Sequence, residues 1–250
     1  MNMLTPLRKT RGYGGHRLRK AVIIIVIAVL LLIAAAACLY FYLCPGGRYT
    51  AADFGVTTAV SPVDFNGNGV DDYRDIMLGA RRDAQNHVTY NAAYFVGGYP
   101  PDNAGVCADE IWRAFKNAGY DLKAMVDKDI AADTAAYLPA GAAPDPNIDF
   151  RRVSNLKIFF KRHAVPLTLD IKDRARWQPG DIVILGRSHI GVISDIRDKN
   201  GVPYLIHNNN QPWNREEDAL PLYAVTRRVN GHYRFDASLA DKSLLIAWAN

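Results

Sequence analysis

An uninterrupted apolar run, Ala21 to Cys44, constrains the fold of this 250-residue chain most strongly. As a helix it would extend roughly 36 Å at about 1.5 Å per residue. That length crosses a hydrocarbon core of roughly 30 Å. The run exceeds the apolar part of an ordinary signal peptide, about 7–15 residues. We therefore expect residues 21–44 to form one transmembrane anchor.

Basic residues precede the apolar run and predict its orientation. The six are Arg8, Lys9, Arg11, Arg17, Arg19 and Lys20, with no acidic residue among them. Positive charge favours the cytoplasmic side, so we expect residues 1–20 to be a cytoplasmic tail and residues 45–250 to be extracytoplasmic. The protein would then be a single-pass cell-membrane protein. Two cleaved alternatives stay open: a small-residue site within Ala34–Ala37, and a lipoprotein-like box ending at Cys38.

The charge of the remainder argues against nucleic acid as a partner. Beyond the basic tail the chain carries 24 basic and 25 acidic side chains, so the formal charge of +5 belongs to the tail. A nucleic-acid-binding domain usually presents a basic face. We expect a membrane association through one helix and no nucleic-acid partner.

Residues 45–63 read as a linker, and a loop with calcium-ligand spacing follows it. The candidate ligands are Asp64, Asn66, Asn68, Val70 (through its carbonyl), Asp72 and Asp75, with Gly69 as the turn glycine. This spacing supplies the oxygens that calcium prefers. The loop resembles that of dockerins, with Asp instead of Glu at its twelfth position. The alternative is an Asn/Gly-rich turn that caps a helix over Ile76–Asp83. We expect structural calcium and no cofactor for catalysis.

The residues from 84 to 250 predict an α+β domain. Helical patterns cover residues 107–118, Leu122–Asp133 and Leu156–Phe160, and residues 134–148 read as a loop. Strands are expected over Ile182–Leu185, His189–Ser194, Pro203–His207, Arg227–Phe235 and Leu244–Trp248. Helices followed by a strand meander favour an antiparallel sheet with helices packed on it.

Cys107 stands at the start of the first of these helices. Cys38 and Cys44 fall in the apolar run, so we expect Cys107 to have no disulfide partner. Backbone N–H groups and the helix dipole at an N-terminus favour the thiolate, the nucleophilic form. The alternative is a buried structural cysteine.

Two histidines on the predicted strands would complete a nucleophilic site. A cysteine nucleophile needs a base, and the base needs a group that fixes its tautomer. His189 opens one strand and His207 ends the next, close enough for their rings to hydrogen-bond. We expect Cys107 as nucleophile, His189 as base and His207 as orienting group, with Asn208 as the alternative third residue. Tyr99 would assist the backbone oxyanion donors. Zinc bound by the same Cys/His/His trio is a further alternative.

The motifs together resemble a known family. Gly-Val-Cys107-Ala-Asp-Glu-Ile-Trp, Asp-Pro-Asn-Ile-Asp149-Phe-Arg151-Arg152-Val, Trp177-Gln-Pro-Gly-Asp181, His189-Ile-Gly-Val-Ile and Ile-His207-Asn208 look like the bacterial domain-of-unknown-function family twelve-eighty-seven. The resemblance covers roughly residues 70–236, and the order of motifs is also similar to NlpC-type papain-like enzymes, mostly peptidoglycan endopeptidases and amidases. It implies a papain-like catalytic domain in which Cys107, His189 and His207 match nucleophile, base and third residue. Ala108 stands where the family usually has Thr.

These observations lead to one expected function and two alternatives. We expect a membrane-anchored cysteine hydrolase that cleaves amide bonds in peptidoglycan or another cell-wall peptide. Arg151 and Arg152 would bind substrate carboxylates bidentately, unless they pair with Asp145 or Asp149. The alternatives are a non-catalytic wall-binding module on the same fold, and a thiol acyltransferase or transglutaminase-like enzyme.

Overall fold

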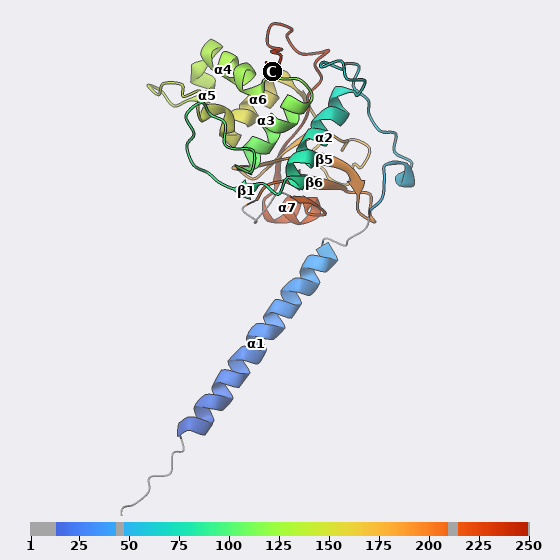
Figure 1. The fold of residues 1–250 in the computed structure, drawn as a ribbon. Coiled ribbons are helices and arrows are strands. Elements are labelled where there is room, and N and C mark those ends of the chain that lie inside the picture. The colour runs from blue at the N-terminus through green and yellow to red at the C-terminus, as the bar shows by residue number, and fades with distance from the viewer. Residues whose placement is uncertain (1–13, 44–47, 210–214, 250) are drawn as a thin grey trace, which may run out of the picture. The chain divides into compact units, whose positions relative to one another are not determined.

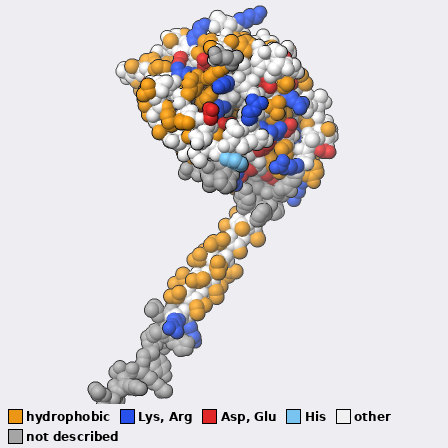
Figure 2. Space-filling model, viewed as in Figure 1, with side chains coloured by type: hydrophobic (Ala, Val, Ile, Leu, Met, Phe, Trp, Pro, Cys, Tyr) orange, Lys and Arg blue, Asp and Glu red, His pale blue; other side chains and the backbone are white. Residues whose placement is uncertain are grey.

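The first helix of the computed structural model contains the predicted anchor. The structure describes residues 14–43, 48–209 and 215–249. Helix α1 (Gly14–Leu43) includes Arg19–Leu39, a stretch long and apolar enough to cross a membrane. Its aliphatic side chains are exposed all round (Figure 2). Most of the predicted tail (1–13) and Cys44 lie outside the described residues. The chain divides into two compact units, 1–43 and 44–250.

The described part of the predicted linker, residues 48–63, belongs to the second unit. It contains the 3-10 helix η1 (Ala52–Phe54). Tyr49 forms a bridge with Arg197, and the Gln178 side chain hydrogen-bonds the backbone of residues 57 and 59. These contacts join the segment to the rest of the second unit, and its assignment as a linker stays a prediction.

The helices precede the main sheet, as predicted, with longer bounds for some. They are α2 (Asp72–Gln85), α3 (Cys107–Asn117), α4 (Leu122–Ala132), α5 (Thr134–Tyr137) and α6 (Val153–His163), with the 3-10 helix η2 (Asp149–Arg151) before α6. The chain leaves α3 through Gly119 at φ +89°, a conformation that favours glycine. The short α5 lies in a segment that the sequence predicts as loop.

The sheet is antiparallel, which confirms the predicted α+β class. Its strands are β3 (Val165–Pro166), β4 (Ile182–Leu185), β5 (His189–Arg197), β6 (Pro203–His207), β7 (Arg215–Glu217) and β8 (Val229–Arg234), in the order β3-β8-β4-β5-β6-β7. Helix α7 (Leu220–Thr226) links β7 to β8. A separate parallel pair joins β1 (Thr89–Tyr90) and β2 (Ala104–Gly105).

One predicted strand is absent from the sheet. Within the described residues, Leu244–Trp248 contributes a single bridge, between Tyr120 and Ala247. Trp248 packs its ring on Trp112 of α3. This apolar segment covers helices instead of extending the sheet, and an apolar run alone cannot distinguish the two outcomes.

The two faces of the sheet meet different partners (Figure 1). One face packs on α2, α3 and α6 through Ile182, Ile184, Ile190, Val192 and Ile206. The other packs on Trp177 and on Leu220 of α7 through Val183, Leu185, Ile193 and Leu205. Since side chains alternate along a strand, His189 and His207 belong to the α7 face, and Asn208 to the α3 face.

Candidate functional site

Cys107 is the first residue of α3, as the sequence predicts. Val106, the N-cap, is extended (φ −116°, ψ 179°), and its amide donates to the Asp109 carboxylate at 2.7 Å. Gly105 must lack a side chain, because a Cβ there would lie 2.8 Å from Cβ of Asp109. Local hydrogen bonding therefore fixes the turn that presents the cysteine.

Arg151 secures the same turn. Its guanidinium donates two hydrogen bonds to Asp109, at 2.7 and 2.9 Å, and both side chains are buried. Trp112 donates a third to this carboxylate at 3.0 Å. The predicted role of Arg151 in binding a substrate carboxylate is therefore not available, because a carboxylate of the protein already occupies its fork. Within the described residues Arg151 forms its ion pair with Asp109, and not with Asp145 or Asp149, the two partners considered from the sequence.

Arg152 lies apart from Arg151. Its side chain is 54% exposed and pairs with Asp149 at 3.4 Å. That pairing matches the structural alternative drawn from the sequence. Arg152 does not line the pocket that contains Cys107. The predicted substrate contact through Arg152 receives no support from its position.

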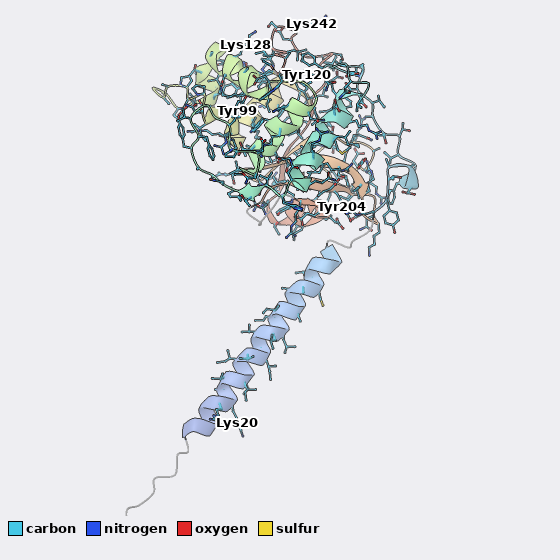
Figure 3. The ribbon with its side chains drawn as sticks, viewed as in Figure 1. Lys20, Tyr99, Tyr120, Lys128, Tyr204 and Lys242 are labelled. Atoms are coloured by element: carbon cyan, nitrogen blue, oxygen red, sulfur yellow. The ribbon has the colours of Figure 1, made fainter. Side chains whose placement is uncertain are left out.

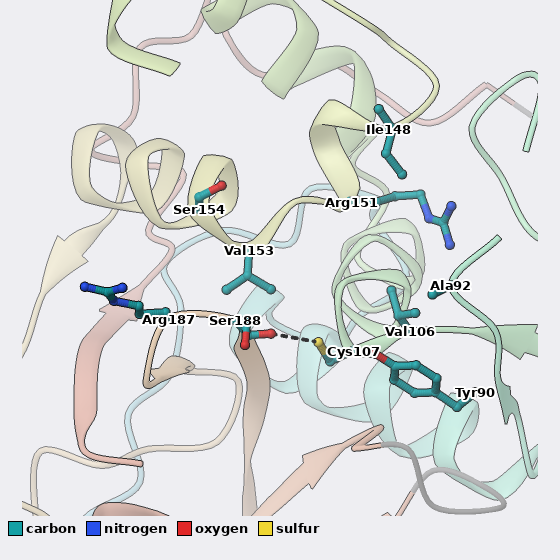
Figure 4. A pocket seen from close by; sticks show the side chains of 10 residues that line it. All are labelled: Tyr90, Ala92, Val106, Cys107, Ile148, Arg151, Val153, Ser154, Arg187 and Ser188. Carbon is teal, nitrogen blue, oxygen red and sulfur yellow. Dashed lines mark hydrogen bonds between the residues drawn. The ribbon is translucent and has the colours of Figure 1, made fainter. Parts of the chain in front are cut away.

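Cys107 opens onto a pocket of about 310 Å³ (Figure 4). Three segments enclose it: the loop from β1 to α3, the start of α6 with η2 before it, and the turn between β4 and β5. Its lining residues are Tyr90, Ala92, Val106, Cys107, Ile148, Arg151, Val153, Ser154, Arg187 and Ser188. No acidic side chain is among these described residues. The pocket thus offers an apolar, acid-free space beside the thiol.

The tyrosine at this pocket is Tyr90, not Tyr99. Tyr99, labelled in Figure 3, packs its ring at an angle on Trp112 and edge-on against Phe150. Its hydroxyl donates to Asp121 at 3.3 Å. Tyr99 therefore does not line the pocket at Cys107, and its position does not fit the predicted oxyanion role. Tyr90 points toward Cys107 in Figure 4. Burial first, then the neighbouring Cys107, raises the pKa of Tyr90.

The thiol of Cys107 is protonated at neutral pH. It donates to the Ser188 carbonyl at 3.8 Å. Burial and, to a smaller extent, Glu110 and Asp109 raise its pKa to about 11, although the Ile190 and Ala108 amides act in the opposite direction. The helix N-terminus was expected to favour the thiolate. Desolvation outweighs that effect here.

A chain of hydrogen bonds crosses three neighbouring strands on the α7 face. Nε2 of His189 lies 2.9 Å from Nδ1 of His207, and Nε2 of His207 lies 3.0 Å from a Glu217 oxygen. The sequence predicts the contact between the two histidines. It missed Glu217, which sits in a polar stretch with no strand pattern. The structure thus places His207 against His189, the contact that the predicted orienting role requires.

Gly191 makes room for this contact. The register pairs Val192 with Ile206, so Gly191 faces His207 and the two histidines are diagonal neighbours. A Cβ on Gly191 would lie 2.7 Å from the Ile206 carbonyl oxygen and 3.1 Å from Cβ of His207. The missing side chain therefore allows the strands and rings to approach.

Tyr223 of α7 covers both imidazoles. Its ring centroid lies 5.7 Å from that of His189 and 5.3 Å from that of His207. Burial, assisted by His207 and by Arg227, lowers the pKa of His189 to about 2. His189 is therefore neutral across the physiological range.

The structure brings Cys107 to the backbone of His189 but not to its ring. The thiol meets the Ser188 carbonyl and the Ile190 amide, on either side of His189. Among the described residues no hydrogen bond joins the sulfur to the His189 imidazole. The two side chains approach β5 from different faces of the sheet. The structure thus shows no hydrogen bond between Cys107 and the His189 ring within the described residues, and the catalytic pair stays a prediction.

Asn208 contacts the cysteine turn and not the histidines. It is 1% exposed, and its amide donates to the Gly105 carbonyl at 3.2 Å. Its side-chain oxygen has no partner among the described residues. The alternative role of Asn208 as the group that orients His189 does not match this placement, since strand alternation puts it on the α3 face.

The predicted calcium loop is partly arranged like a calcium-binding loop. Asp64 accepts hydrogen bonds from the amides of Asn68 and Gly69 at 3.1 and 2.7 Å. Asp75 accepts from the side-chain amides of Asn66 and Asn68 at 2.9 and 2.8 Å. Gly69, at φ +86°, makes the turn. These side chains converge as the sequence predicts.

Asp72 turns away from the loop. Its oxygens accept from the Phe65 amide at 2.9 Å and from the Tyr120 hydroxyl at 2.6 Å. Val70 uses its amide to reach Asn68 at 2.8 Å. No group of three or more His, Cys, Asp or Glu side chains suited to a metal occurs among the described residues. The calcium site and the zinc alternative both stay predictions.

Comparison with known proteins places the chain in a family. The sequence model described as domain of unknown function (DUF1287) matches residues 77–235. The uncharacterized protein YijF of Escherichia coli (strain K12) is 37% identical over 170 residues, which cover 64% of this chain and 80% of YijF. No solved structure matches the chain.

The family match contains Cys107, His189, His207 and Glu217, whereas the calcium-like loop precedes it. It also agrees with the span of roughly residues 70–236 over which the motifs resemble that family. The chain therefore belongs to the DUF1287 family.

Proposed function

We propose that this DUF1287 protein is a papain-like thiol hydrolase that cleaves amide bonds of cell-wall peptides such as peptidoglycan. The observation that carries the proposal is Cys107 at the start of α3, open to a pocket and in contact with the backbone on both sides of a histidine. A cysteine at a helix N-terminus followed by a histidine at the start of a strand is the order found in papain-like enzymes.

The reaction would proceed by acyl transfer. Nδ1 of His189 takes the thiol proton as the sulfur attacks the amide carbonyl carbon, and His189 returns that proton to the departing amine. The resulting thioester is then hydrolysed by water, with His189 as base. The backbone amides of Ala108 and Ile190, next to the sulfur, are suited to stabilise the oxyanion.

Catalysis in this form requires one movement. The Cys107 thiol must leave the Ser188 carbonyl and meet the His189 ring. Catalytic hydrogen bonds are often long in the free enzyme and tighten when substrate binds. The neutral thiol and neutral imidazole then act as a general-base pair and not as a preformed ion pair.

The location of the protein completes the proposal. Helix α1 would anchor the protein in the cell membrane, with the basic tail inside and residues 45–250 outside. Cell-wall peptides lie on that side of the membrane.

Incubation of the full-length protein with muropeptides, followed by mass spectrometry, tests the activity. We expect new fragments, which Cys107→Ala abolishes and Cys38→Ser, in the apolar helix, leaves unchanged. Parallel reactions with an added amine identify an acyltransferase by its transfer product. Full activity in Cys107→Ala would overturn the assignment.

A non-catalytic wall-binding module is the second candidate. The raised pKa of Cys107 and the unformed contact with the His189 ring favour it. It predicts that the protein sediments with isolated cell walls, that Cys107→Ala binds them equally well, and that no fragment is released.

A further inference from the structure

The two imidazoles and Glu217 form a directional series across β5, β6 and β7. Each imidazole ring has two nitrogens, and one of them carries the proton in the neutral ring. Both nitrogens of His207 are engaged, Nδ1 by His189 and Nε2 by Glu217. In His189 only Nε2 is engaged by a described residue, so Nδ1 makes no hydrogen bond within the described chain.

Glu217 is ionised and accepts hydrogen bonds only. Burial alone would raise its pKa, but the hydrogen bond from His207 and the neighbouring Arg215 lower it below the usual value. The guanidinium of Arg215 donates to the second carboxylate oxygen at 3.3 Å. A carboxylate in this state can meet only a donor.

The proton positions then follow one from another. Because Glu217 accepts, Nε2 of His207 carries hydrogen. In the neutral form of His207, which has one ring hydrogen, Nδ1 is then an acceptor. Because Nδ1 of His207 accepts, Nε2 of His189 donates, and the lone pair of His189 is on Nδ1.

We propose that Glu217 is a positioning residue that sets the tautomers of His207 and His189 and leaves Nδ1 of His189 as the basic nitrogen. The inference rests on the proposed function, in which that nitrogen receives the thiol proton. Glu217 does not touch the substrate pocket. It acts through His207.

The same series keeps its hydrogen bonds when the base becomes charged. When His189 becomes an imidazolium, its Nε2–H still donates to His207, whose Nε2–H still donates to the Glu217 carboxylate. Of the other groups that face His189, Tyr223 contributes its aromatic ring and Arg227 opposes the charge. Glu217 supplies the negative charge at the end of the series.

Glu217→Gln tests the proposal, because the amide is similar in size but has no charge and can donate or accept. Full-length protein with 15N-labelled histidine, in detergent micelles, gives the protonation of each ring nitrogen by NMR. We expect Nε2–H on both histidines in the wild type. In the variant we expect a mixture of tautomers.

Glu216→Gln is the matched control on the same strand. Among the described residues Glu216 binds Arg81 and Ser194 and no histidine, so the tautomers should remain those of the wild type. Thermal unfolding followed by circular dichroism confirms that both variants fold. Nδ1–H on His189 of the wild type, or wild-type tautomers in Glu217→Gln, overturns the proposal.

Kinetics with muropeptides add a functional readout. Loss of the correct tautomer should lower kcat roughly tenfold or more in Glu217→Gln with KM unchanged. A kcat unchanged from the wild type would overturn the positioning role. If the wild-type protein releases no fragment, the proposed function fails, while the NMR result still decides the tautomer assignment.

Discussion

The salt bridge between Asp109 and Arg151 is the most consequential single contact near Cys107. Asp109 is fully buried and accepts from a backbone amide, an indole and a guanidinium. Removal of one partner leaves an uncompensated buried charge, which typically costs about 3–5 kcal/mol. The turn that holds the thiol depends on this pair.

Arg151→Ala should therefore lower the free energy of unfolding by about 3–5 kcal/mol. Urea unfolding measures it. The neighbouring Arg152→Ala is the control, because an exposed ion pair contributes about 0–1 kcal/mol. Equal losses in the two variants would contradict the structural role given to Arg151.

The pKa of Cys107 predicts how the thiol reacts. Alkylation requires the thiolate, and a pKa of about 11 means that the thiolate fraction keeps rising through alkaline pH. The iodoacetamide reaction of Cys107, followed on its tryptic peptide, should show no plateau below about pH 10. A plateau near neutrality would indicate a preformed thiolate–imidazolium pair.

Glu110 makes the free energy of unfolding depend on pH in the opposite direction from most carboxylates. It is fully buried, neither oxygen has a partner among the described residues, and burial raises its pKa well above the usual value. In the unfolded chain it ionises near pH 4.3. The contribution of Glu110 to stability is therefore lost as pH rises from that value toward the folded pKa.

Glu110→Gln should raise the melting temperature at pH 7, since glutamine cannot ionise in the unfolded state. The gain should shrink toward pH 4, where the unfolded glutamate is also protonated. Glu217→Gln should show the opposite trend, because the folded pKa of Glu217 is lowered. Calorimetric melting at both pH values checks the two signs.

At the scale of elements, Gly191 decides how closely β5 and β6 approach at the histidines. Gly191→Ala should push the two strands apart, at a cost of about 1–3 kcal/mol for overpacking, and weaken the contact between the rings. NMR of the labelled histidines should show an altered His189–His207 pair. Val192→Ala, on the α3 face of the same strand, should reduce stability but keep that pair.

Local sequence patterns predict the helices and strands that hold the site, but they do not predict which residues its side chains contact. Apolar periodicity predicts α3, β4 and β6 at or near their observed bounds, and adjacent strands predict the His189–His207 contact. Glu217 was missed because a three-residue edge strand carries no apolar alternation. The Asp109–Arg151 pair joins residues 42 positions apart, and only the packing of η2 against α3 makes it visible.

The relation of Cys107 to His189 also depends on tertiary structure. The sequence places a thiol at a helix N-terminus and a histidine at a strand start. It does not specify from which face of the sheet each side chain arrives. Burial of the sulfur, which reverses the expected effect of the helix dipole on its pKa, likewise depends on packing that no local motif encodes.

At the scale of the whole molecule, the testable prediction is the side of the membrane on which residues 45–250 lie. A phosphatase reporter that folds only outside the cytoplasm, fused after Asn250, should be active if residues 45–250 are exported. Replacing the six basic residues before Ala21 with glutamine should reduce that activity, because positive charge sets orientation. An inactive reporter on the unmodified chain would contradict the predicted topology.

The place of Glu217 in the sheet has a consequence for the site. Strand β7 has three residues and ends the sheet, whereas His189 and His207 stand on inner strands. Short strands at a sheet margin open locally at a small fraction of the global unfolding free energy. When β7 frays, the carboxylate of Glu217 leaves His207, so the site loses the order of its protons before the protein unfolds.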